Sequence, residues 1–533
     1  MSDRTVIAEN WGWRHAGRRA WAIRHLDFRL EAGERVLLLG AYGAGKSTLL
    51  AALAGVLTGG NEGESEGSLL MGGQPPQARR GHSALVLQDP QSQIVLARVG
   101  DDVAFGCENM AMPPDRIWPT VSSSLTAVGL DLQLDHPTGH LSGGQQQRLV
   151  LAGALAMGAE LLLLDEPTAN LDPAGADQVR DAVAAAVADR RRGLVVVEHH
   201  CEVWADMVDR VLVLSPAGTV ADGPPHQVFN QLGRQLADMG VWVPQKHLVA
   251  GRGQRGLASH AETRHEVDQP GENRLDRQDP AKGGQGPNRG VDQRDEKRPP
   301  RQDPPTNGPV ALPDPIITCT DLAVGYGKEA VCDGITIAIP RGQSTVITGA
   351  NGSGKTTLAL TLAGLLPPVS GLVETQAPFA PLRRPQPHTW TSKQLLTRIG
   401  AVFQSPDHQF VASTVFDEIA VGLRALKRDR ATIDATVTDL LERLGLAKLA
   451  KANPFTLSGG EKRRLSVATV LACEPSVIVL DEPTFGQDRS TWLALVALIA
   501  DLRDRGATIV SVTHDSGYIT RLGDHRIDLG EHR

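Results

Sequence analysis

Two segments of this chain have the residue types and spacing of a phosphate-binding loop. Gly40–Ser47 and Gly349–Thr356 have the form G-x-x-x-x-G-K-[ST], and each follows an apolar run and precedes a helical pattern. Glycines let backbone N–H groups turn toward phosphate oxygens, and the positive end of the following helix adds attraction. The lysines would reach the β- and γ-phosphates, and the Ser or Thr hydroxyl can bind Mg²⁺. A single motif could be a glycine-rich turn without a ligand, but two with matching downstream residues favour nucleotide binding.

The residues downstream of the two loops repeat in the same order. The pairs are Gln88 and Gln404, Leu141–Gln145 and Leu457–Glu461, Asp165-Glu166 and Asp481-Glu482, and His199 and His514. The two glutamines, like the two aspartates, lie 316 residues apart. A period of this length is not a solenoid repeat and indicates a duplicated whole domain.

Each Asp-Glu pair ends an apolar run that predicts a buried strand. A buried carboxylate is costly unless it meets a cation, so Asp165 and Asp481 are predicted to bind Mg²⁺ or its waters. Glu166 and Glu482 would orient and polarise an attacking water. The two histidines also follow strands. A lone strand-end histidine is more often structural, but two copies in register favour contact with the γ-phosphate.

Composition limits the classes of protein to which the chain can belong. Its 533 residues carry a net charge of −7, which does not favour nucleic acid as a partner. The five cysteines form no C-x-x-C pair, which argues against zinc and fits a reducing compartment. No run resembles a signal peptide or a membrane span. We therefore expect a soluble chain that depends on another subunit for any work across a membrane.

The sequence divides into two similar units joined by a polar segment. Residues 1–245 form the first unit and 313–533 the second. The segment between them, 246–312, contains Gly251–Pro309, which is rich in Gly, Pro, Gln, Asp, Arg and Asn and nearly free of aliphatic residues. Such a composition cannot bury enough surface to offset its ordering entropy, so we expect a disordered linker.

Both units alternate short aliphatic strands with helical stretches, which predicts an α/β fold with a parallel sheet. The predicted core strands are Arg35–Leu39, Leu161–Leu164, Leu194–Val197, Thr345–Thr348, Val477–Leu480 and Thr508–Val512. An antiparallel β subdomain is expected before each phosphate loop. Its predicted strands are Arg4–Glu9, Ile23–Leu30, Ile316–Leu322 and Gly334–Ile339.

The set of phosphate loop, Gln, Leu-Ser-Gly-Gly, Asp-Glu and His resembles the ATP-binding cassette (ABC) family of P-loop NTPases. The resemblance covers everything but the linker, and the Leu-Ser-Gly-Gly signature is its discriminating part. On its own the signature could be a serine N-cap with a glycine turn. The resemblance implies ATP and Mg²⁺ as cofactors, ATP hydrolysis, and a helical subdomain in each cassette. It also implies that two cassettes close on two ATP molecules, here within one chain. Each ATP would lie between one unit's phosphate loop and the other unit's signature.

The resemblance assigns roles residue by residue. Catalytic roles fall to Glu166, Glu482, His199, His514, Gln88 and Gln404. ATP contacts fall to Gly40, Gly43, Gly45, Lys46, Ser47, Thr48, Gly349, Gly352, Gly354, Lys355, Thr356, Thr357, Ser142, Gly143, Gly144, Gln145, Ser458, Gly459, Gly460, Glu461, Asp172 and Asp488. Mg²⁺ contacts fall to Ser47, Thr356, Gln88, Gln404, Asp165 and Asp481. No site has lost its catalytic glutamate or its Ser-Gly-Gly. The departures are Glu198-His199-His200 in place of Thr-His-Asp, and Glu461 in place of Gln.

The resemblance also implies an aromatic partner for the adenine base near the start of each unit. Tyr326 is predicted to stack on adenine in the second unit. In the first unit the position falls to Trp13 or His15. Trp13 is favoured because its aromatic face is larger.

The segments after the two glutamines resemble those of energy-coupling-factor importers, which take up vitamins, vitamin precursors of the HMP/thiamine kind, cobalt or nickel. The Pro406–Gln409 stretch, Pro-Asp-His-Gln, carries this resemblance. It implies an integral membrane coupling subunit and a separate substrate-binding membrane subunit as partners, and a peripheral location on the cytoplasmic face of the membrane. The sequence of this chain does not indicate the transported substrate.

Docking onto the coupling subunit is predicted at Asp89–Ala97 and Ser405–Ser413. Both segments mix polar residues with apolar ones, including Val95 and Phe410, which suits a protein interface. The alternative is that these apolar side chains complete the core of the helical subdomain.

Three other classes of ABC protein were weighed. A tandem sugar-importer ATPase usually has one degraded site. A soluble twin-cassette translation factor would have a charged helical hairpin as linker, whereas this linker is rich in helix breakers. A DNA-repair protein would need zinc cysteines or long heptad repeats, and neither occurs.

Overall fold

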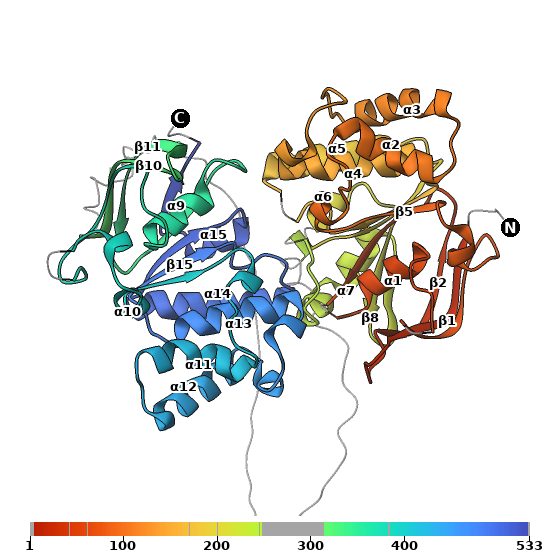
Figure 1. Cartoon of the computed structure of the whole chain (residues 1–533). Helices are drawn as coiled ribbons and strands as arrows, with labels where there is room; N and C mark the ends of the chain where they lie inside the picture. The colour runs from red at the N-terminus through yellow and green to blue at the C-terminus, as the bar shows by residue number, and fades with distance from the viewer. Residues whose placement is uncertain are drawn as a thin grey trace, which may run out of the picture. The chain divides into compact units, whose positions relative to one another are not determined.

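The computed structural model describes residues 5–41, 43–60, 62–169, 171–199, 201–244, 246–247, 314–381 and 384–530. All of them lie in one compact unit, Met1–Ala250 with Pro313–Arg533. Within it, the residues before 248 form cassette 1 and those after 313 form cassette 2 (Figure 1). Apart from residues 246–247, the predicted linker lies outside the described residues.

Cassette 1 contains the following elements. Its strands are β1 (Val6–His15), β2 (Ile23–Leu30), β3 (Arg35–Gly40), β4 (Gly63–Met71), β5 (Ser83–Val86), β6 (Leu161–Asp165), β7 (Gly193–Val197), β8 (Arg210–Ser215) and β9 (Gly218–Gly223). Its helices are α1 (Lys46–Leu53), α2 (Val99–Asn109), α3 (Pro114–Ala127), α4 (Gly143–Ala156), α5 (Pro173–Val187), α6 (Cys201–Trp204) and α7 (Pro225–Asp238). Short 3₁₀ turns are η1 (Pro76–Arg79), η2 (Pro90–Ser92) and η3 (Thr138–His140).

Cassette 2 repeats this order. Its strands are β10 (Pro315–Tyr326), β11 (Glu329–Pro340), β12 (Ser344–Thr348), β13 (Ser370–Thr375), β14 (Ile399–Val402), β15 (Val477–Asp481), β16 (Thr508–Val512) and β17 (His525–Asp528). Its helices are α9 (Lys355–Leu362), α10 (Ser392–Leu396), α11 (Val415–Ala425), α12 (Arg430–Arg443), α13 (Gly459–Leu471), α14 (Arg489–Asp504) and α15 (Ser516–Leu522). Its 3₁₀ turns are η4 (Pro387–Thr389), η5 (Pro406–His408), η6 (Ala447–Leu449) and η7 (Pro454–Thr456).

The central sheets confirm the predicted parallel α/β core. In cassette 1 the strand order is β5-β6-β7-β3-β8-β9, and only β9 is antiparallel to its neighbour. In cassette 2 the order is β14-β15-β16-β12-β17, all parallel. The central strands are buried throughout and consist mostly of Val, Ile and Leu, with buried Ser and Thr in β12 and β16, because helices cover both faces of a parallel sheet. The carboxyl ends of β3, β6 and β7 therefore meet at one edge, where a crossover topology places ligands.

The antiparallel sheets are β2-β1-β4 and β11-β10-β13, so a third strand from beyond the phosphate loop completes each one. β1 continues six residues past the predicted end at Glu9, to His15. Its register against β4 shifts between Glu9 and Gly12, and Asn10 has a φ of 48°. This bulge changes which face the later residues present, and an alternation count from Glu9 cannot anticipate it.

The predicted helical subdomains are present as well. α2 and α3 lie together at one end of cassette 1, and α11 and α12 lie at one end of cassette 2 (Figure 1). α2 packs on α4, and α11 packs on α13, each through a buried apolar face. Because α4 and α13 begin at the signature residues, these subdomains are joined directly to the predicted ATP contacts.

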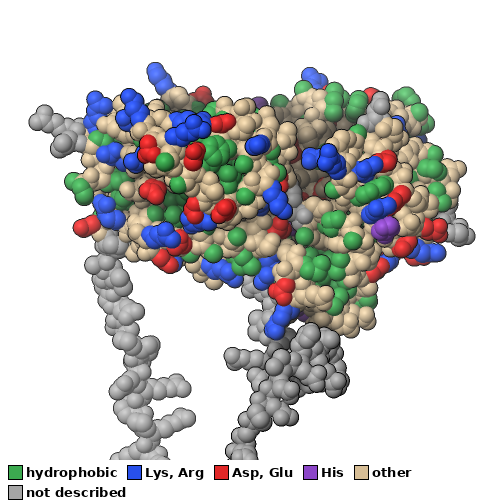
Figure 2. All heavy atoms as spheres, turned by 90° about the horizontal axis from the view of Figure 1, so that it is seen from below, with side chains coloured by type: hydrophobic (Ala, Val, Ile, Leu, Met, Phe, Trp, Pro, Cys, Tyr) green, Lys and Arg blue, Asp and Glu red, His purple; other side chains and the backbone are tan. Residues whose placement is uncertain are grey.

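The part of the chain that the structure describes contains no helix long and apolar enough to cross a membrane. On the face drawn in Figure 2, Lys and Arg side chains are scattered among Asp, Glu and hydrophobic ones. This mixture is what the sequence predicts from its small net charge, and it forms no single-sign field on that face.

Candidate functional site: two ATP sites

Both phosphate loops connect a core strand to a helix, as predicted. Gly45 and Gly354 precede α1 and α9 with φ values of 86° and 92°, which glycine adopts without strain. The ammonium group of Lys46 donates to the Gly40 carbonyl at 2.9 Å. Lys355 donates to the Gly349 carbonyl at the same distance. Burial lowers the pKa of both lysines, although nearby carboxylates oppose the shift. Each loop thus surrounds the buried ammonium group of its own lysine. This group is the one predicted to contact the β- and γ-phosphates.

The predicted Mg²⁺ residues lie together in each cassette. The Thr356 hydroxyl donates to Asp481 Oδ2 at 2.8 Å, while Asp481 Oδ1 is buried without a hydrogen-bond partner. In cassette 1 the Ser47 hydroxyl faces Asp165 and opposes the effect of burial on the pKa of that carboxyl group. Burial raises the pKa of both aspartates. An orphaned buried carboxylate oxygen beside a hydroxyl fits Mg²⁺, which prefers such oxygen ligands.

The two predicted catalytic glutamates share an unusual backbone conformation. Glu166 has a φ of 50° and Glu482 a φ of 47°, and non-glycine residues seldom adopt such values. The N–H of each donates to a strand carbonyl, Val197 O or Val512 O, at 2.9 Å. Such strain clusters at functional sites and here aims both side chains off the strand end.

In cassette 1 the structure brings three predicted catalytic residues together. The Gln88 amide donates to Glu166 Oε2 at 2.9 Å, and His199 Nε2 lies 2.9 Å from Glu166 Oε1. Burial alone would lower the pKa of His199, but the charge and hydrogen bond of Glu166 raise it. The glutamine, the glutamate and the histidine thus form one hydrogen-bonded group.

Cassette 2 holds the equivalent residues differently. Glu482 Oε2 accepts a hydrogen bond from the Thr513 hydroxyl at 3.0 Å, and burial raises the pKa of Glu482 to about 7. Nε2 of His514 is buried without a partner, and burial lowers its pKa. Gln404 is exposed, and its side chain makes no hydrogen bond to Glu482 in the described residues. A buried nitrogen without a partner fits the predicted γ-phosphate contact.

The signature residues begin helices in both cassettes. Ser142 caps α4 in a reciprocal capping box with Gln145, and Ser458 caps α13 with Glu461. The serine N-cap, which the sequence offered as an alternative to the signature, is therefore real. It does not compete with the signature reading, because the glycines that follow place the first N–H groups of the helix where an anion binds. The contact with ATP stays a prediction.

The two aspartates of the loops after the catalytic glutamates cap the next helices. Asp488 accepts from the Thr491 N–H at 2.8 Å. Asp172 caps α5 and also accepts the Asn351 N–H, in the second phosphate loop, at 2.9 Å. This bond crosses from cassette 1 to cassette 2 and is of the kind expected if the two sites are linked.

The structure corrects the adenine partner of cassette 1. Trp13 is 3% exposed and belongs to the hydrophobic core, so it has no free face for a base. Gly45 lies against Ile23, and Gly354 lies against Cys332. Ile23 and Cys332 therefore occupy equivalent places in the two cassettes.

The strand register then identifies the equivalent residues. Trp13 pairs with Ile23, and Val324 pairs with Cys332. His15 lies two residues after Trp13, and Tyr326 lies two residues after Val324. His15 is therefore the equivalent of Tyr326, whose side chain is 58% exposed. Trp13 instead supports His15, because its Nε1 donates to His15 Nδ1 at 3.3 Å. His15 Nε2 lies 3.2 Å from the Thr48 hydroxyl, beside the phosphate loop.

The docking segments also need a correction. Phe410 is 6% exposed and packs against Phe455 with ring centroids 6.0 Å apart, so it belongs to the core. Its neighbour Val411 is 76% exposed. In cassette 1, Val95 is 63% exposed, and its contact with a membrane subunit stays a prediction. Apolar residues in a short loop do not alternate regularly, so the sequence could not tell Phe410 from Val411.

Each docking segment is held by one carboxylate. Asp102 Oδ1 accepts the Val95 N–H at 2.8 Å. In cassette 2, Glu418 Oε2 accepts the Val411 N–H at 2.9 Å. Both acidic residues lie in the first turn of the following helix, α2 or α11.

Sequence reasoning missed other residues that shape the sites. Arg463, on the buried face of α13, donates to the Phe403 and Gln404 carbonyls, and burial lowers its pKa to about 10. It supports the backbone of the glutamine segment, whereas the equivalent residue in cassette 1 is Gln147, which bonds Leu87 O at 3.4 Å. The sequence signal that could have identified Arg463 is a charged residue on a helix face that is otherwise mostly apolar.

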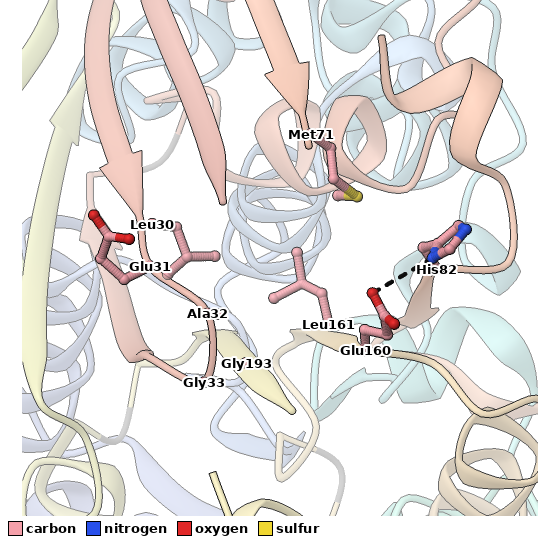
Figure 3. Close-up of a pocket in the computed structure, with 9 residues that line it drawn as sticks. All are labelled: Leu30, Glu31, Ala32, Gly33, Met71, His82, Glu160, Leu161 and Gly193. Atoms are coloured by element: carbon pink, nitrogen blue, oxygen red, sulfur yellow. Dashed lines mark hydrogen bonds and ion pairs between the residues drawn. The ribbon is translucent and has the colours of Figure 1, made fainter. Parts of the chain in front are cut away.

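A small pocket lies elsewhere in cassette 1 (Figure 3). It is lined by Leu30, Glu31, Ala32, Gly33, Met71, His82, Glu160, Leu161 and Gly193. Leu161 and Gly193 begin β6 and β7, so the pocket is at the opposite strand ends from Asp165 and His199. None of the predicted site residues lines it, and in this topology ligands bind at the carboxyl ends instead.

Two phosphate loops, two strand-end Asp-Glu pairs and two signature helices define an ATPase built from paired ATP-binding cassettes. The ABC transporter family matches residues 23–169 and 332–485, more than half of the chain. The chain belongs to this family, and ATP hydrolysis is its activity.

Relatives match along nearly the whole chain. The "Putative HMP/thiamine import ATP-binding protein YkoD" of Bacillus subtilis (strain 168) is 31% identical over 510 residues, which cover 94% of this chain and 85% of the relative. A "Putative ABC transporter ATP-binding protein" of Methanosarcina acetivorans is 32% identical, covering 93% and 79%. Among solved structures, the archaeal ribosome recycling factor aABCE1 matches with a TM-score of 0.59 at 19% identity, covering 97% and 87%, which shows the fold alone.

Proposed function

We propose that this protein is the ATP-hydrolysing subunit of an energy-coupling-factor importer for a vitamin, a vitamin precursor or a transition-metal ion. The observation that carries the proposal is the pair of docking segments. Each follows the predicted γ-phosphate glutamine and presents one exposed valine from a backbone fixed by a carboxylate. The name of the Bacillus relative supports an HMP- or thiamine-type substrate.

Hydrolysis would use each cassette's own residues. Glu166 and Glu482 orient and activate the water, while His199 and His514 contact the γ-phosphate. When bound through Ser47 and Asp165, or through Thr356 and Asp481, Mg²⁺ would supply charge stabilisation for the phosphate oxygens. Each signature would contact the ATP on the phosphate loop of the other cassette.

Coupling to the membrane follows from position in the chain. Gln88 bonds the catalytic Glu166, and the docking segment begins at the next residue. Closure on ATP would therefore move Val95 against a membrane partner. The partners are an integral coupling subunit and a substrate-binding subunit, and the chain would lie at the cytoplasmic face of the membrane.

The experiment is affinity purification of the full chain from membranes in mild detergent, with identification of the co-purifying subunits. Wild type is compared with V95D and V411D, and V56D serves as the matched control because Val56 is an exposed valine outside both segments. We expect wild type and V56D to retain multi-span membrane subunits, and V95D and V411D to lose them while keeping ATP binding. If no membrane subunit co-purifies with wild type, the importer proposal is wrong.

A further inference from the structure

The threonine two residues after each catalytic glutamate is buried and bonds a carboxylate. In cassette 1, the Thr168 hydroxyl donates to Glu198 Oε2 at 2.5 Å, and its N–H donates to the same oxygen at 3.4 Å. In cassette 2, the Thr484 hydroxyl donates to Asp515 Oδ2 at 2.9 Å. Both threonines are about as buried as the core, so these bonds are shielded from water.

The two carboxylates come from different positions of the chain. Glu198 is the residue before His199, whereas Asp515 is the residue after His514. The longer glutamate reaches the threonine from one side of the histidine, and the shorter aspartate reaches it from the other. The same anchor for the loop after the catalytic glutamate is therefore built in two ways.

Because Asp515 supplies the anchoring carboxylate in cassette 2, the residue before His514 does not have to be acidic. Thr513 occupies the place that Glu198 has in cassette 1. Its fully buried hydroxyl donates to Glu482 Oε2 at 3.0 Å and accepts the Asp515 N–H at 3.1 Å. Cassette 1 has no threonine there, and Glu166 is oriented by Gln88 and His199 instead.

We propose that Glu198 and Asp515 are equivalent positioning residues, each anchoring the loop after a catalytic glutamate, and that Thr513 is a positioning residue which cassette 2 alone uses to orient its catalytic glutamate. The two ATP sites then differ in what disturbs them. Loss of the Thr513 hydroxyl affects the Glu482 site, whereas loss of the Gln88 amide affects the Glu166 site. The proposal rests on the ATPase activity and does not depend on the transported substrate.

The first test replaces Thr513 in the full chain. T513V is isosteric and removes only the hydroxyl, T513S restores it, and T508V is the matched control because Thr508 is equally buried in β16. Turnover is measured in the E166Q background, where Glu482 alone can activate water. We expect T513V to lower kcat about 10-fold with KM for ATP unchanged, since small misplacements of a catalytic group cost up to about 100-fold. T513S and T508V should stay within about twofold of the background.

Hydrogen exchange of the peptide spanning residues 482–488 provides a readout independent of turnover. We expect faster exchange in T513V than in T513S or T508V. If T513V matches T508V in both kcat and exchange, Thr513 does not position Glu482 and this part of the proposal is wrong.

The second test is a double-mutant cycle on the anchors. T168V and E198A remove the two ends of one bond, so their effects on exchange of residues 166–169 should be strongly non-additive. T484V and D515A should behave in the same way for residues 482–488. The cross pair T168V with D515A should be additive, because the two residues belong to different anchors. Additivity within either anchor pair would overturn the proposed equivalence.

Discussion

In cassette 1 the predicted catalytic glutamate is bound by a glutamine and a histidine. In cassette 2 the equivalent glutamate accepts a hydrogen bond from a threonine hydroxyl, and the histidine has a buried nitrogen without a partner. The glutamine, the glutamate and the histidine are present in both cassettes, and the strands and loops that bear them correspond. The residues one position before and one position after each histidine also differ between the cassettes. Equivalent motifs can therefore produce sites with different electrostatics, and kinetic equivalence does not follow from motif identity.

The largest expected effect comes from removing either catalytic carboxylate. E166Q and E482Q should each reduce turnover at their own site by about 100-fold or more, because water activation is lost while ATP binding remains. Steady-state hydrolysis and retention of labelled nucleotide measure the two properties. A wild-type rate in either variant would contradict the assignment for that cassette.

The contrast between the two docking segments predicts unequal effects on stability. F410A should lower the free energy of unfolding by about 3–5 kcal/mol, because it empties a core position. V411A should change it by less than about 0.5 kcal/mol, because Val411 is exposed. Chemical denaturation of the two variants makes the comparison, and equal effects would reject our separation of core from surface here.

The raised pKa of Glu482 predicts that ATP hydrolysis at its site depends on pH. Burial raises its pKa to about 7, and the groups facing it are Thr513, Asp481, Lys355, Asp515 and Arg463. The carboxylate form activates water, so kcat/KM of the E166Q variant should fall as pH decreases through about 7, by about tenfold at pH 6. A profile flat from pH 6 to 8 would contradict this role, as would an increase toward low pH.

Base stacking offers a smaller contrast. H15A and Y326A should each weaken ATP binding at their own site by about 5-fold or more, while H15F and Y326F retain it, since stacking on an aromatic ring contributes about 1–3 kcal/mol. W13A should instead lower thermal stability, because Trp13 is part of the core. Titration with fluorescent nucleotide and thermal unfolding distinguish these results. Weaker ATP binding in W13A without loss of stability would restore Trp13 as the base partner.

The smallest effect is expected from the linker. Shortening 246–312 to about half its length should leave ATPase activity nearly unchanged, because loop-closure entropy varies slowly with length. Its predicted task is to keep the cassettes at high local concentration. A large loss of hydrolysis in the shortened chain would show that the segment has a further role.

Patterns that are local in sequence predicted the fold well. Runs of mostly aliphatic residues marked the core strands to within a residue, since a strand buried on both faces is mostly apolar. The phosphate loops, the Asp-Glu pairs and the signatures were placed in the same way.

The errors concern features decided by distant contacts. Trp13 and His15 are two residues apart in one strand and share the same alternation, so only the packing of Trp13 in the core separates them. The bond between Thr168 and Glu198 joins residues thirty positions apart, and an unusual Glu-His pair in the sequence does not reveal it. Phe410 and Val411 are adjacent apolar residues, and only tertiary packing gives one of them to the core.

The carboxylates that hold the docking segments have a consequence for how this surface can change. Asp102 and Glu418 accept hydrogen bonds from main-chain N–H groups, which every residue type except proline supplies. The shape of each segment is therefore independent of the side chain at Val95 or Val411. If these segments dock as proposed, single substitutions at the two valines would re-target the protein to a differently contoured partner while the segment itself keeps its path. The same property would make them the first positions to randomise in a library that selects for a new coupling subunit.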